Sequence, residues 1–315
     1  MRNTALRYFL EVARSGSLGR ASEKLHIAPS AISRQIAKLE EEAGTQLFER
    51  LPTGMVLSPA GEVLAAHARR EHLEQERILA EIQELSSDGG SLISVASTEG
   101  VARNFLPHVM SEFRESYPRT RFALNVAIPK IVIGMVKDGD VDLGITFSTK
   151  PSEGVHIEYS ARSQIHALMH RGHPLGKRKS LTLHDLQPYP MALKEEGSTQ
   201  RQLVDLCCQL EGITLNPVLT SNDSGSLQQF VFRSDAIALT SKVSEQYELQ
   251  KGGLISIPLL NAELGQRNVQ MLTMAGRILP INIRRFVELV ATKMAAMDEE
   301  AQPPEGGRKS KSSPI

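Results

Sequence analysis

The sequence predicts an α/β protein in which a small, mainly helical N-terminal unit is joined by one long helix to a larger α/β domain. Three observations support this. Up to residue 58 apolar residues recur at helical spacing, apart from two short strand-like runs. Residues 59–88 contain no helix breaker before Asp88-Gly89-Gly90, and from residue 91 strand-length apolar runs alternate with helical patterns. At 315 residues the chain is long enough for two or three domains.

Two consecutive helices are predicted within residues 17–43. The first pattern breaks at residues 26–28, and the second begins at Pro29, because Pro suits a first turn whose N–H groups have no helical partner. On the second helix Ile32, Ile36 and Leu39 recur at i, i+4 and i+7, which predicts one buried stripe. This arrangement indicates a helix-turn-helix.

The opposite face of the second helix carries Ser30, Ser33, Arg34, Ala37 and Lys38. Small residues let the helix lie close to a surface, short hydroxyls can bind phosphates, and a guanidinium can reach base edges in a major groove. The sequence therefore predicts DNA binding through this face. An ordinary helical hairpin within a larger core is the alternative interpretation.

A β-hairpin wing is predicted after these helices. Residues 47–50 and 55–57 read as two short strands around Pro52-Thr53-Gly54, and Arg50 is placed to bind a phosphate. Residues 1–58 are thus expected to form a winged helix-turn-helix DNA-binding domain.

The helix that starts at Ser58-Pro59 is expected to be roughly 40 Å long, at 1.5 Å for each residue. Its apolar residues form a sparse stripe among many charges: Val63, Leu64, Leu73, Ile78, Leu79, Ile82 and Leu85. A mostly polar long helix needs a partner for such a stripe, so residues 59–88 are predicted to link the domains and to pair two subunits. A solvated spacer rod is the alternative.

Residues 89–297 are predicted to form one α/β unit with a parallel sheet covered by helices on both faces, and its short loops allow two lobes. A single helix is expected over residues 99–116. The last segment, residues 298–315, has no apolar run and is expected to be disordered.

Composition narrows the function. The 36 basic and 36 acidic residues balance, so a DNA contact must be a local face. The only two cysteines, Cys207 and Cys208, are adjacent and cannot build a disulfide framework, which fits a reducing cytosol, and no signal or membrane-spanning pattern is present. The nine histidines show no metal-ligand spacing, and no phosphate loop or nucleophile elbow is found. We therefore expect a cytoplasmic protein that is not an enzyme and has no metal or cofactor.

The motifs resemble those of a known family. Residues 5–50 read A-L-R-Y-F-L-E-V-A-R-S-G-S-L-G-R-A-S-E-K-L-H-I-A-P-S-A-I-S-R-Q-I-A-K-L-E-E-E-A-G-T-Q-L-F-E-R, and L-S-P-A-G follows at residues 57–61. Further on stand F-L-P, F-R-E-S-Y-P and D-G-D-V-D-L-G-I. Apart from its tail, the chain resembles a LysR-type transcriptional regulator from end to end. Two departures from the family pattern are Ala28-Pro29 in place of the frequent Ser-Gln, and a wing that lacks a common basic residue.

The resemblance implies a specific organisation. Promoter DNA would be bound by the winged helix-turn-helix, the linker helix would form a homodimer, and two dimers would assemble as a homotetramer. The regulatory domain would resemble periplasmic binding proteins, with one lobe at about residues 91–161 and 266–297 and the other at about 162–265. A small effector would bind between the lobes.

An effector site is predicted at the carboxyl ends of the strands, where an open α/β sheet leaves a crevice. The residues that follow predicted strands in the first lobe are Ser97, Thr98, Glu99, Ile128, Pro129, Thr146 and Phe147, and those in the second lobe include Ser198, Thr199 and Asn222. Helix starts among them favour an anionic group, whereas Glu99, Glu195 and Glu196 would repel a plain dicarboxylate. A ligand with both an acid and an amine, or with several hydroxyls, would fit both observations. These residues are also ordinary helix caps, which is the alternative.

Taken together, the patterns predict a ligand-responsive transcriptional regulator that binds double-stranded promoter DNA. One alternative is a cytosolic solute-binding or sensor module whose N-terminal helices serve assembly only. Another is a catalytic α/β domain fused to a winged helix, against which the missing catalytic set counts.

Overall fold

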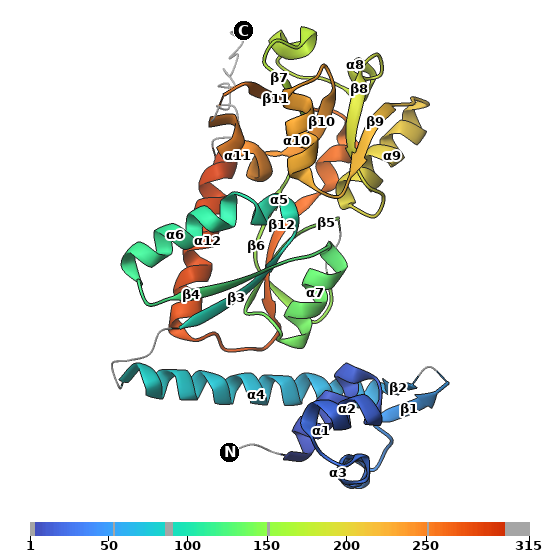
Figure 1. The fold of residues 1–315 in the computed structure, drawn as a ribbon, viewed down its shortest axis with the longest axis vertical. Helices are drawn as coiled ribbons and strands as arrows, with labels where there is room; N and C mark the ends of the chain where they lie inside the picture. The colour runs from blue at the N-terminus through green and yellow to red at the C-terminus, as the bar shows by residue number, and fades with distance from the viewer. Residues whose placement is uncertain (1–3, 53, 86–90, 150–151, 251, 300–315) are drawn as a thin grey trace, which may run out of the picture.

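The computed structural model describes residues 4–52, 54–85, 91–149, 152–250 and 252–299. It confirms the predicted architecture of a winged helix-turn-helix, a long helix and a two-lobed α/β domain (Figure 1). Most of the predicted tail, residues 300–315, lies outside the described residues, and its first two residues belong to the last helix.

The N-terminal domain consists of helices α1 (Thr4–Ser15), α2 (Leu18–Leu25) and α3 (Pro29–Ala43) and the antiparallel hairpin β1 (Phe48–Leu51) and β2 (Gly54–Leu57). Local sequence sets these boundaries. The Ser17 hydroxyl accepts a hydrogen bond from the Arg20 N–H at the start of α2, and His26 and Gly44 end α2 and α3 in the left-handed conformation. Ile32 and Ile36 of α3 are buried with Phe9 of α1, as the predicted stripe requires.

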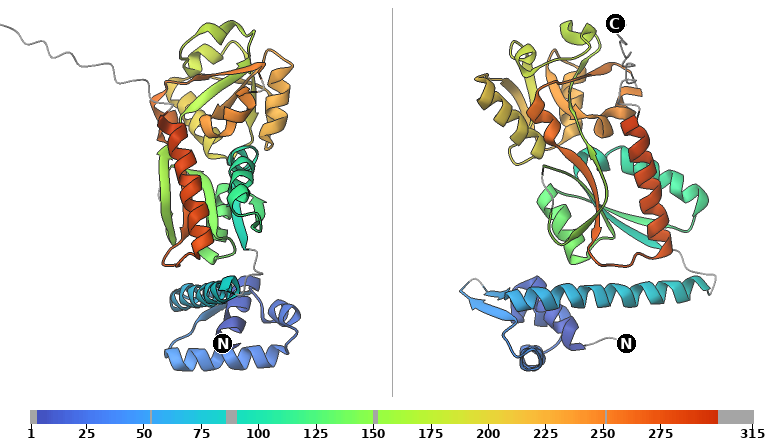
Figure 2. Two further views of the ribbon diagram at one scale, coloured as in Figure 1. Left: turned by 90° about the vertical axis from the view of Figure 1, so that its left-hand side faces the viewer. Right: turned by 180° about the vertical axis from the view of Figure 1, so that it is seen from behind.

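The long helix α4 (Pro59–Leu85) begins where the Ser58 hydroxyl accepts a hydrogen bond from the Gly61 N–H. Its first turns complete the core of the N-terminal domain through Ala65. Beyond that core α4 continues as a rod that lies across the end of the regulatory domain, with the N-terminal domain at one end (Figures 1 and 2).

The first lobe contains a five-stranded sheet in the order β4-β3-β5-β12-β6. Helices α6 and α12 pack on one face around Phe105, Phe113 and Phe286, and α7 packs on the other through Val132 and Val136. Its elements are β3 (Leu92–Ser97), α5 (Glu99–Ala102), α6 (Phe105–Ser116), β4 (Arg121–Val126), α7 (Pro129–Asp138), β5 (Leu143–Ser148), β6 (Val155–Arg162), β12 (Asn268–Met274) and α12 (Ile281–Glu299).

The second lobe contains a five-stranded sheet in the order β11-β7-β10-β8-β9. Two hydrophobic clusters cover its faces, one under α9 and one under α10. Its elements are β7 (Ile165–His170), the 3-10 turn η1 (Pro174–Lys177), α8 (Leu183–Leu186), β8 (Pro190–Lys194), α9 (Thr199–Glu211), β9 (Asn216–Ser221), α10 (Ser224–Phe232), β10 (Ile237–Ser241), α11 (Lys242–Gln250), β11 (Leu254–Pro258) and η2 (Ala262–Gln266).

Three features differ from the sequence prediction. The sheets are mixed and not purely parallel, because β12 runs antiparallel to β5 and β6, and β7 runs antiparallel to β10 and β11. The helix expected over residues 99–116 is two helices, α5 and α6, separated at residues 103–104. Strand β6 and helix α11 were not predicted. Helix α11 lacks a regular apolar spacing, whereas β6 alternates apolar and polar residues from Val155 to Arg162, and this strand signal was overlooked.

The chain passes between the lobes twice, from β6 to β7 and from β11 to β12, as the resemblance implied. The two passing segments are joined where the Ser163 N–H donates a hydrogen bond to the Arg267 carbonyl oxygen at 2.8 Å. This pair lies on the hinge between the lobes.

In the described part of the chain, no helix is both long enough and apolar enough to span a bilayer.

Candidate functional site

The predicted DNA-binding face of α3 is open to solvent. Ser30, Arg34 and Lys38 are exposed, and Ser33 is half-buried. Lys38 forms a long ion pair with Glu42 on the same helix, at 3.7 Å. The guanidinium and ammonium groups of this face are therefore available to an outside partner.

The wing lies beside this helix. Ser33 of α3 and Arg50 of β1 line the same groove, which has a volume of about 310 Å³. Glu40 fixes this geometry, because its Oε1 accepts hydrogen bonds from the backbone N–H groups of Leu47 at 2.9 Å and Phe48 at 3.4 Å. The structure thus brings the predicted phosphate ligand of the wing next to the predicted recognition helix.

A cavity of about 470 Å³ lies between the two lobes. It is lined by most of the residues that the sequence placed there, from both lobes: Thr98, Glu99, Ile128, Pro129, Phe147, Ser198, Thr199 and Asn222. Glu195, Glu196 and Thr240 line it too. The rule that strand ends converge on a crevice therefore located a real cavity.

Ser97 and Thr146 do not line this cavity, although the sequence prediction included them. Both side chains are fully buried, and their hydroxyls point to backbone carbonyls of the next residue, at 3.1 Å from Ser97 Oγ to the Thr98 oxygen and at 3.5 Å from Thr146 Oγ1 to the Phe147 oxygen. Successive side chains of a strand point to opposite faces, so Phe147 faces the cavity while its neighbour Thr146 points away from it.

Glu99 plays a different part from the one expected. Its carboxylate reaches across the cavity to the second lobe, where it accepts hydrogen bonds from the Lys194 ammonium at 2.5 Å and from the Ser224 N–H at 2.7 Å and hydroxyl at 2.7 Å. These donors neutralise the charge that was expected to repel an acidic ligand. Glu99 therefore connects the lobes, and its own charge is compensated by these donors.

Sequence reasoning missed several polar residues of the cavity, among them Lys194, Gln228 and Arg267. Lys194 ends a strand, so the strand-end rule could have found it had the strand been predicted one residue longer. Gln228 lies within α10, and Arg267 lies on the segment that passes between the lobes. No local pattern marks either of them.

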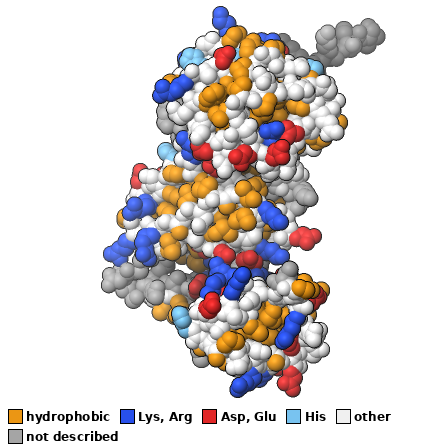
Figure 3. Space-filling model, turned by 45° about the vertical axis from the view of Figure 1, so that its right-hand side comes forward, with side chains coloured by type: hydrophobic (Ala, Val, Ile, Leu, Met, Phe, Trp, Pro, Cys, Tyr) orange, Lys and Arg blue, Asp and Glu red, His pale blue; other side chains and the backbone are white. Residues whose placement is uncertain are grey.

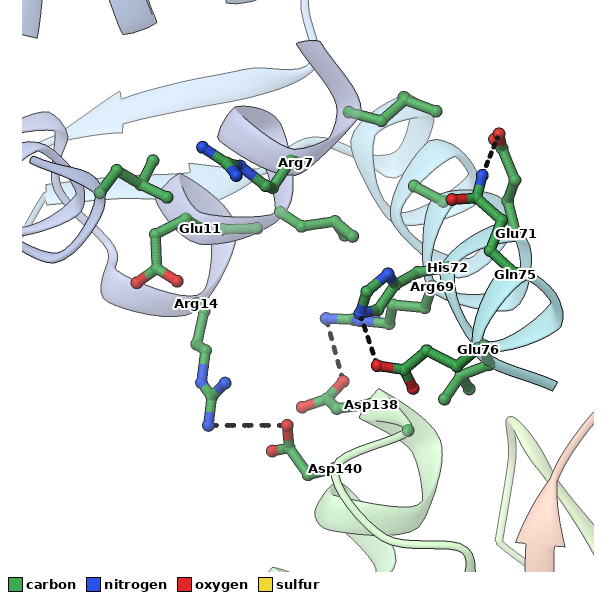
Figure 4. Close-up of a pocket in the computed structure, with 17 residues that line it drawn as sticks. Arg7, Glu11, Arg14, Arg69, Glu71, His72, Gln75, Glu76, Asp138 and Asp140 are labelled. Carbon is green, nitrogen blue, oxygen red and sulfur yellow. Dashed lines mark hydrogen bonds and ion pairs between the residues drawn. The ribbon is translucent and has the colours of Figure 1, made fainter. Parts of the chain in front are cut away.

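A second cavity, of about 680 Å³, lies where the N-terminal domain, α4 and the first lobe meet. Two ion pairs cross it, Arg69 to Asp138 at 3.0 Å and Arg14 to Asp140 at 3.6 Å (Figure 4). Figure 3 shows basic and acidic side chains gathered at this junction. Helix α7 connects the two cavities, because Pro129 at its start lines the interlobe cavity and Asp138 at its end contacts α4.

The adjacent cysteines show no sign of a reactive site. Cys207 is fully buried, and burial, together with nearby Glu263, raises the pKa of its thiol to about 12. A thiol with such a pKa is not a nucleophile at neutral pH. Among the residues that the structure describes, no group of His, Cys, Asp and Glu side chains is arranged to hold a metal ion.

Comparison with known proteins shows the same two functional units. The model of the bacterial regulatory helix-turn-helix proteins of the lysR family matches residues 4–62, and the model of the LysR substrate binding domain matches residues 87–295. The transcriptional dual regulator GltC of Bacillus subtilis is 34% identical over 211 residues, which cover 65% of this chain and 69% of that protein. A probable nitrogen assimilation transcriptional activator of Synechococcus elongatus is 26% identical over 94% of this chain and 96% of its own.

Solved structures have the same fold. The match to a full-length OxyR variant from Pseudomonas aeruginosa covers 98% of this chain and 99% of the OxyR chain, with a TM-score of 0.64 and 21% sequence identity. The match to full-length CbnR in complex with its target DNA covers 93% of this chain and 99% of the CbnR chain, with a TM-score of 0.53 and 21% sequence identity. The chain belongs to the LysR family of DNA-binding transcriptional regulators. Its domains are those of a ligand-responsive member, with a helix-turn-helix followed by a substrate-binding domain.

Proposed function

We propose that the α3 face and the wing bind promoter DNA with distinct roles for their residues. Arg34 reads a base edge in the major groove, and Lys38 adds charge. Ser30, Ser33 and Arg50 hold phosphates. The observation that supports this most is the placement of an open, basic α3 face directly beside the arginine of the wing, across one groove.

The binding of fluorescent promoter DNA tests these roles. Anisotropy titrations would use a fragment of the protein's own promoter and a random fragment of equal length, over a range of salt concentrations. Losing a guanidinium contact to guanine typically costs about 1–3 kcal/mol, so Arg34→Ala should bind the promoter roughly tenfold more weakly and lose most of its preference over random DNA.

Arg50→Ala should weaken binding to both fragments equally. It should also reduce the slope of log affinity against log salt concentration by about the amount that one phosphate contact contributes. Arg114→Ala, on α6 of the first lobe, is the charge-matched control and should behave as wild type. Equal losses on both fragments for Arg34→Ala and Arg50→Ala would refute the division of roles. No promoter binding at any salt concentration would favour a sensor module whose N-terminal helices serve assembly only.

We further infer that the effector binds in the interlobe cavity. Thr98, Glu99, Ile128, Pro129 and Phe147 would form one wall, and Ser198, Thr199 and Asn222 would form part of the other. A ligand there would touch both lobes and the start of α7, whose far end contacts α4. This connection supports a route from the ligand to the DNA-binding domain. Ser97 and Thr146, which are fully buried, would support this wall without touching the ligand.

The linker helix supports a homodimer. Leu73 is buried where α4 meets the first lobe, close to Gly139, whereas Ile78, Leu79 and Ile82 are exposed. Nine residues turn a helix by about two and a half turns, so Leu73 and Ile82 lie on opposite faces of α4. One face thus holds the protein's own regulatory domain, and the other is free for a second subunit. Pairing of two such dimers would give the homotetramer that the resemblance implies.

The proposed role acts on promoter DNA and therefore in the cytoplasm, and it requires binding and not catalysis. It also requires no cofactor. The cavity residues act by contacting a small molecule.

A further inference from the structure

A buried arginine without a charged partner lines the interlobe cavity. Arg267 is only 4% exposed, and its Nε has no hydrogen-bond partner. Its Nη2 reaches the Ser163 hydroxyl only at 3.4 Å, and its Cζ lies 4.2 Å from the centre of the Phe147 ring. No ion pair joins Arg267 to any acidic side chain of the described ranges. Burying an unpaired charge is costly, and buried charges in proteins are normally paired.

Arg267 does not avoid the cost of an unpaired buried charge by losing its proton. Burial lowers the pKa of the Arg267 guanidinium to about 9, so the group still carries its positive charge at neutral pH. The acidic wall residue Glu99 of the first lobe already accepts hydrogen bonds from Lys194 and Ser224 of the second lobe. The positive charge of Arg267 is therefore left without a contacting carboxylate among the described residues, and an anion from solution would compensate it.

Two further polar groups of the same cavity are buried and unpaired. Thr98 is 8% exposed and its Oγ1 has no partner, and Gln228 is 5% exposed and its Oε1 has none. An unsatisfied buried polar atom is costly, so such atoms mark places where a ligand restores hydrogen bonds. Three unpaired groups from α10, the α5 cap and the hinge converge on one cavity.

The rest of the lining defines the body of the ligand. Ile128, Phe147, Leu168, Leu227 and Leu239 contribute apolar surface, and about 470 Å³ is space for a small organic molecule and not merely for an inorganic ion. Glu195 and Glu196 are exposed at the rim, where they would repel a second negative charge.

We propose that the cavity binds an organic monocarboxylate whose carboxylate pairs with Arg267, whose body packs on the apolar wall, and which also satisfies Thr98 and Gln228. This inference rests on the proposed function of the cavity as the effector site. The planar guanidinium suits a two-pronged carboxylate contact. Because Arg267 lies on the hinge beside Ser163, the contact also joins the ligand to the segments that connect the lobes.

Calorimetric titration of the full-length protein tests the ligand class. The probes are butyrate, hexanoate and benzoate, the neutral amide of each acid, succinate, and inorganic sulfate and phosphate. At least one monocarboxylate should bind at least tenfold more tightly than its own amide and than succinate. Equal affinity for acid and amide, binding of sulfate or phosphate alone, or no binding of any monocarboxylate would overturn the inference.

Variants test the role of Arg267 itself. Arg267→Gln should weaken the binding of that monocarboxylate at least tenfold, and Arg267→Lys should retain part of the affinity, because the charge is kept and the planar fork is lost. Arg285→Gln is the matched control, since Arg285 also stacks on an aromatic ring, Tyr117, at 5.5 Å but on the surface of α12. Wild-type affinity in Arg267→Gln would overturn the assignment.

Thermal unfolding separates a ligand-binding role from a structural one. If the Arg267 charge stays unpaired until an anion binds, the Arg267→Met variant should unfold at an equal or higher temperature than wild type without ligand. The carboxylate should then no longer raise the unfolding temperature of this variant. A lower unfolding temperature, with the carboxylate effect intact, would mean that Arg267 serves the fold and would overturn the inference. Promoter binding by the wild-type protein without carboxylate tests the proposed function separately: if it is present while no carboxylate binds, only the ligand class is wrong.

Discussion

A single charge on the free face of α4 is expected to break the dimer. Ile78, Leu79 and Ile82 are 44, 58 and 56% exposed in the single chain. They lie on the side of α4 that faces away from the subunit's own regulatory domain. Ile82→Asp would place a carboxylate in the middle of the contact that these side chains are expected to form with a second subunit.

The size of the effect follows from these exposed fractions. Full burial of an Ile or Leu side chain contributes about 1.5–3 kcal/mol, so a half-exposed one can contribute roughly 1 kcal/mol more on dimerisation. Three side chains from each of two subunits then contribute roughly 6 kcal/mol. Losing Ile82 from both subunits removes about 2 kcal/mol, or roughly thirtyfold in affinity. Desolvating two carboxylates costs several kcal/mol more, so the dissociation constant should rise by more than about a thousandfold.

Sedimentation velocity over a range of protein concentrations measures this effect. Ile82→Leu should assemble as wild type, Ile82→Ala should show the smaller loss, and Ile82→Asp should sediment as a monomer at micromolar concentration. Far-ultraviolet circular dichroism checks that the variants remain helical. An unchanged assembly state in Ile82→Asp would refute the reasoning and would place the dimer contact elsewhere.

Three further predictions concern the regulatory domain. Thr98→Val keeps the shape and removes an unpaired hydroxyl, so the affinity for the bound carboxylate should fall about tenfold in calorimetry; unaltered affinity would exclude Thr98 from the site. Glu99→Gln replaces the charged acceptor of the Lys194 and Ser224 hydrogen bonds by a neutral one, so the Ser224 amide hydrogen should exchange about tenfold faster than in wild type. An exchange rate equal to that of wild type would mean that Glu99 does not hold the lobes together. The Ser226 hydroxyl and then its N–H hold the pKa of Asp223 down to about 2, below its ordinary 3.8, so this cap stabilises α10 above about pH 4 and is lost as the pH falls towards 2. Asp223→Ala should therefore reduce the unfolding free energy by about 1 kcal/mol at pH 7, with a difference that shrinks towards pH 2 in urea titrations; a constant difference would contradict this.

Much of the fold could be predicted because it depends on local patterns. The Ile32–Ile36 spacing, the Pro29 start and the Gly44 end define α3, and the structure contains each of them. The mixed sheets could not be predicted in the same way, because strand direction depends on how the chain passes between the lobes. Two returning segments make β7 and β12 antiparallel to their neighbours, and no local sequence signal reports that route.

The cavity could be located from the sequence, but its chemistry could not. The strand-end rule correctly found Thr98 and Phe147 but wrongly included Ser97 and Thr146. It failed there because a position at a strand end does not say to which face of the sheet the side chain points. The charge of Glu99 is compensated by Lys194 and Ser224, and Arg267 packs on Phe147 and Ser163; all these partners are far away in sequence. The sequence predicted a ligand with both an acid and an amine, or with several hydroxyls. Because Glu99 is already paired, we propose a single acid instead.

DNase I footprinting of the full-length protein on its own promoter, with and without the carboxylate that binds most tightly, is the most direct measurement of ligand-responsive DNA binding. We expect protection of two half-sites separated by one helical turn of about 10.5 base pairs or a multiple of it, with a protected pattern or a half-maximal protein concentration that changes when the carboxylate is added. In Arg267→Gln the carboxylate should no longer cause that change. Protection that is the same on random DNA, or that is identical with and without saturating carboxylate in the wild-type protein, would contradict a regulator whose interlobe cavity controls its DNA contacts.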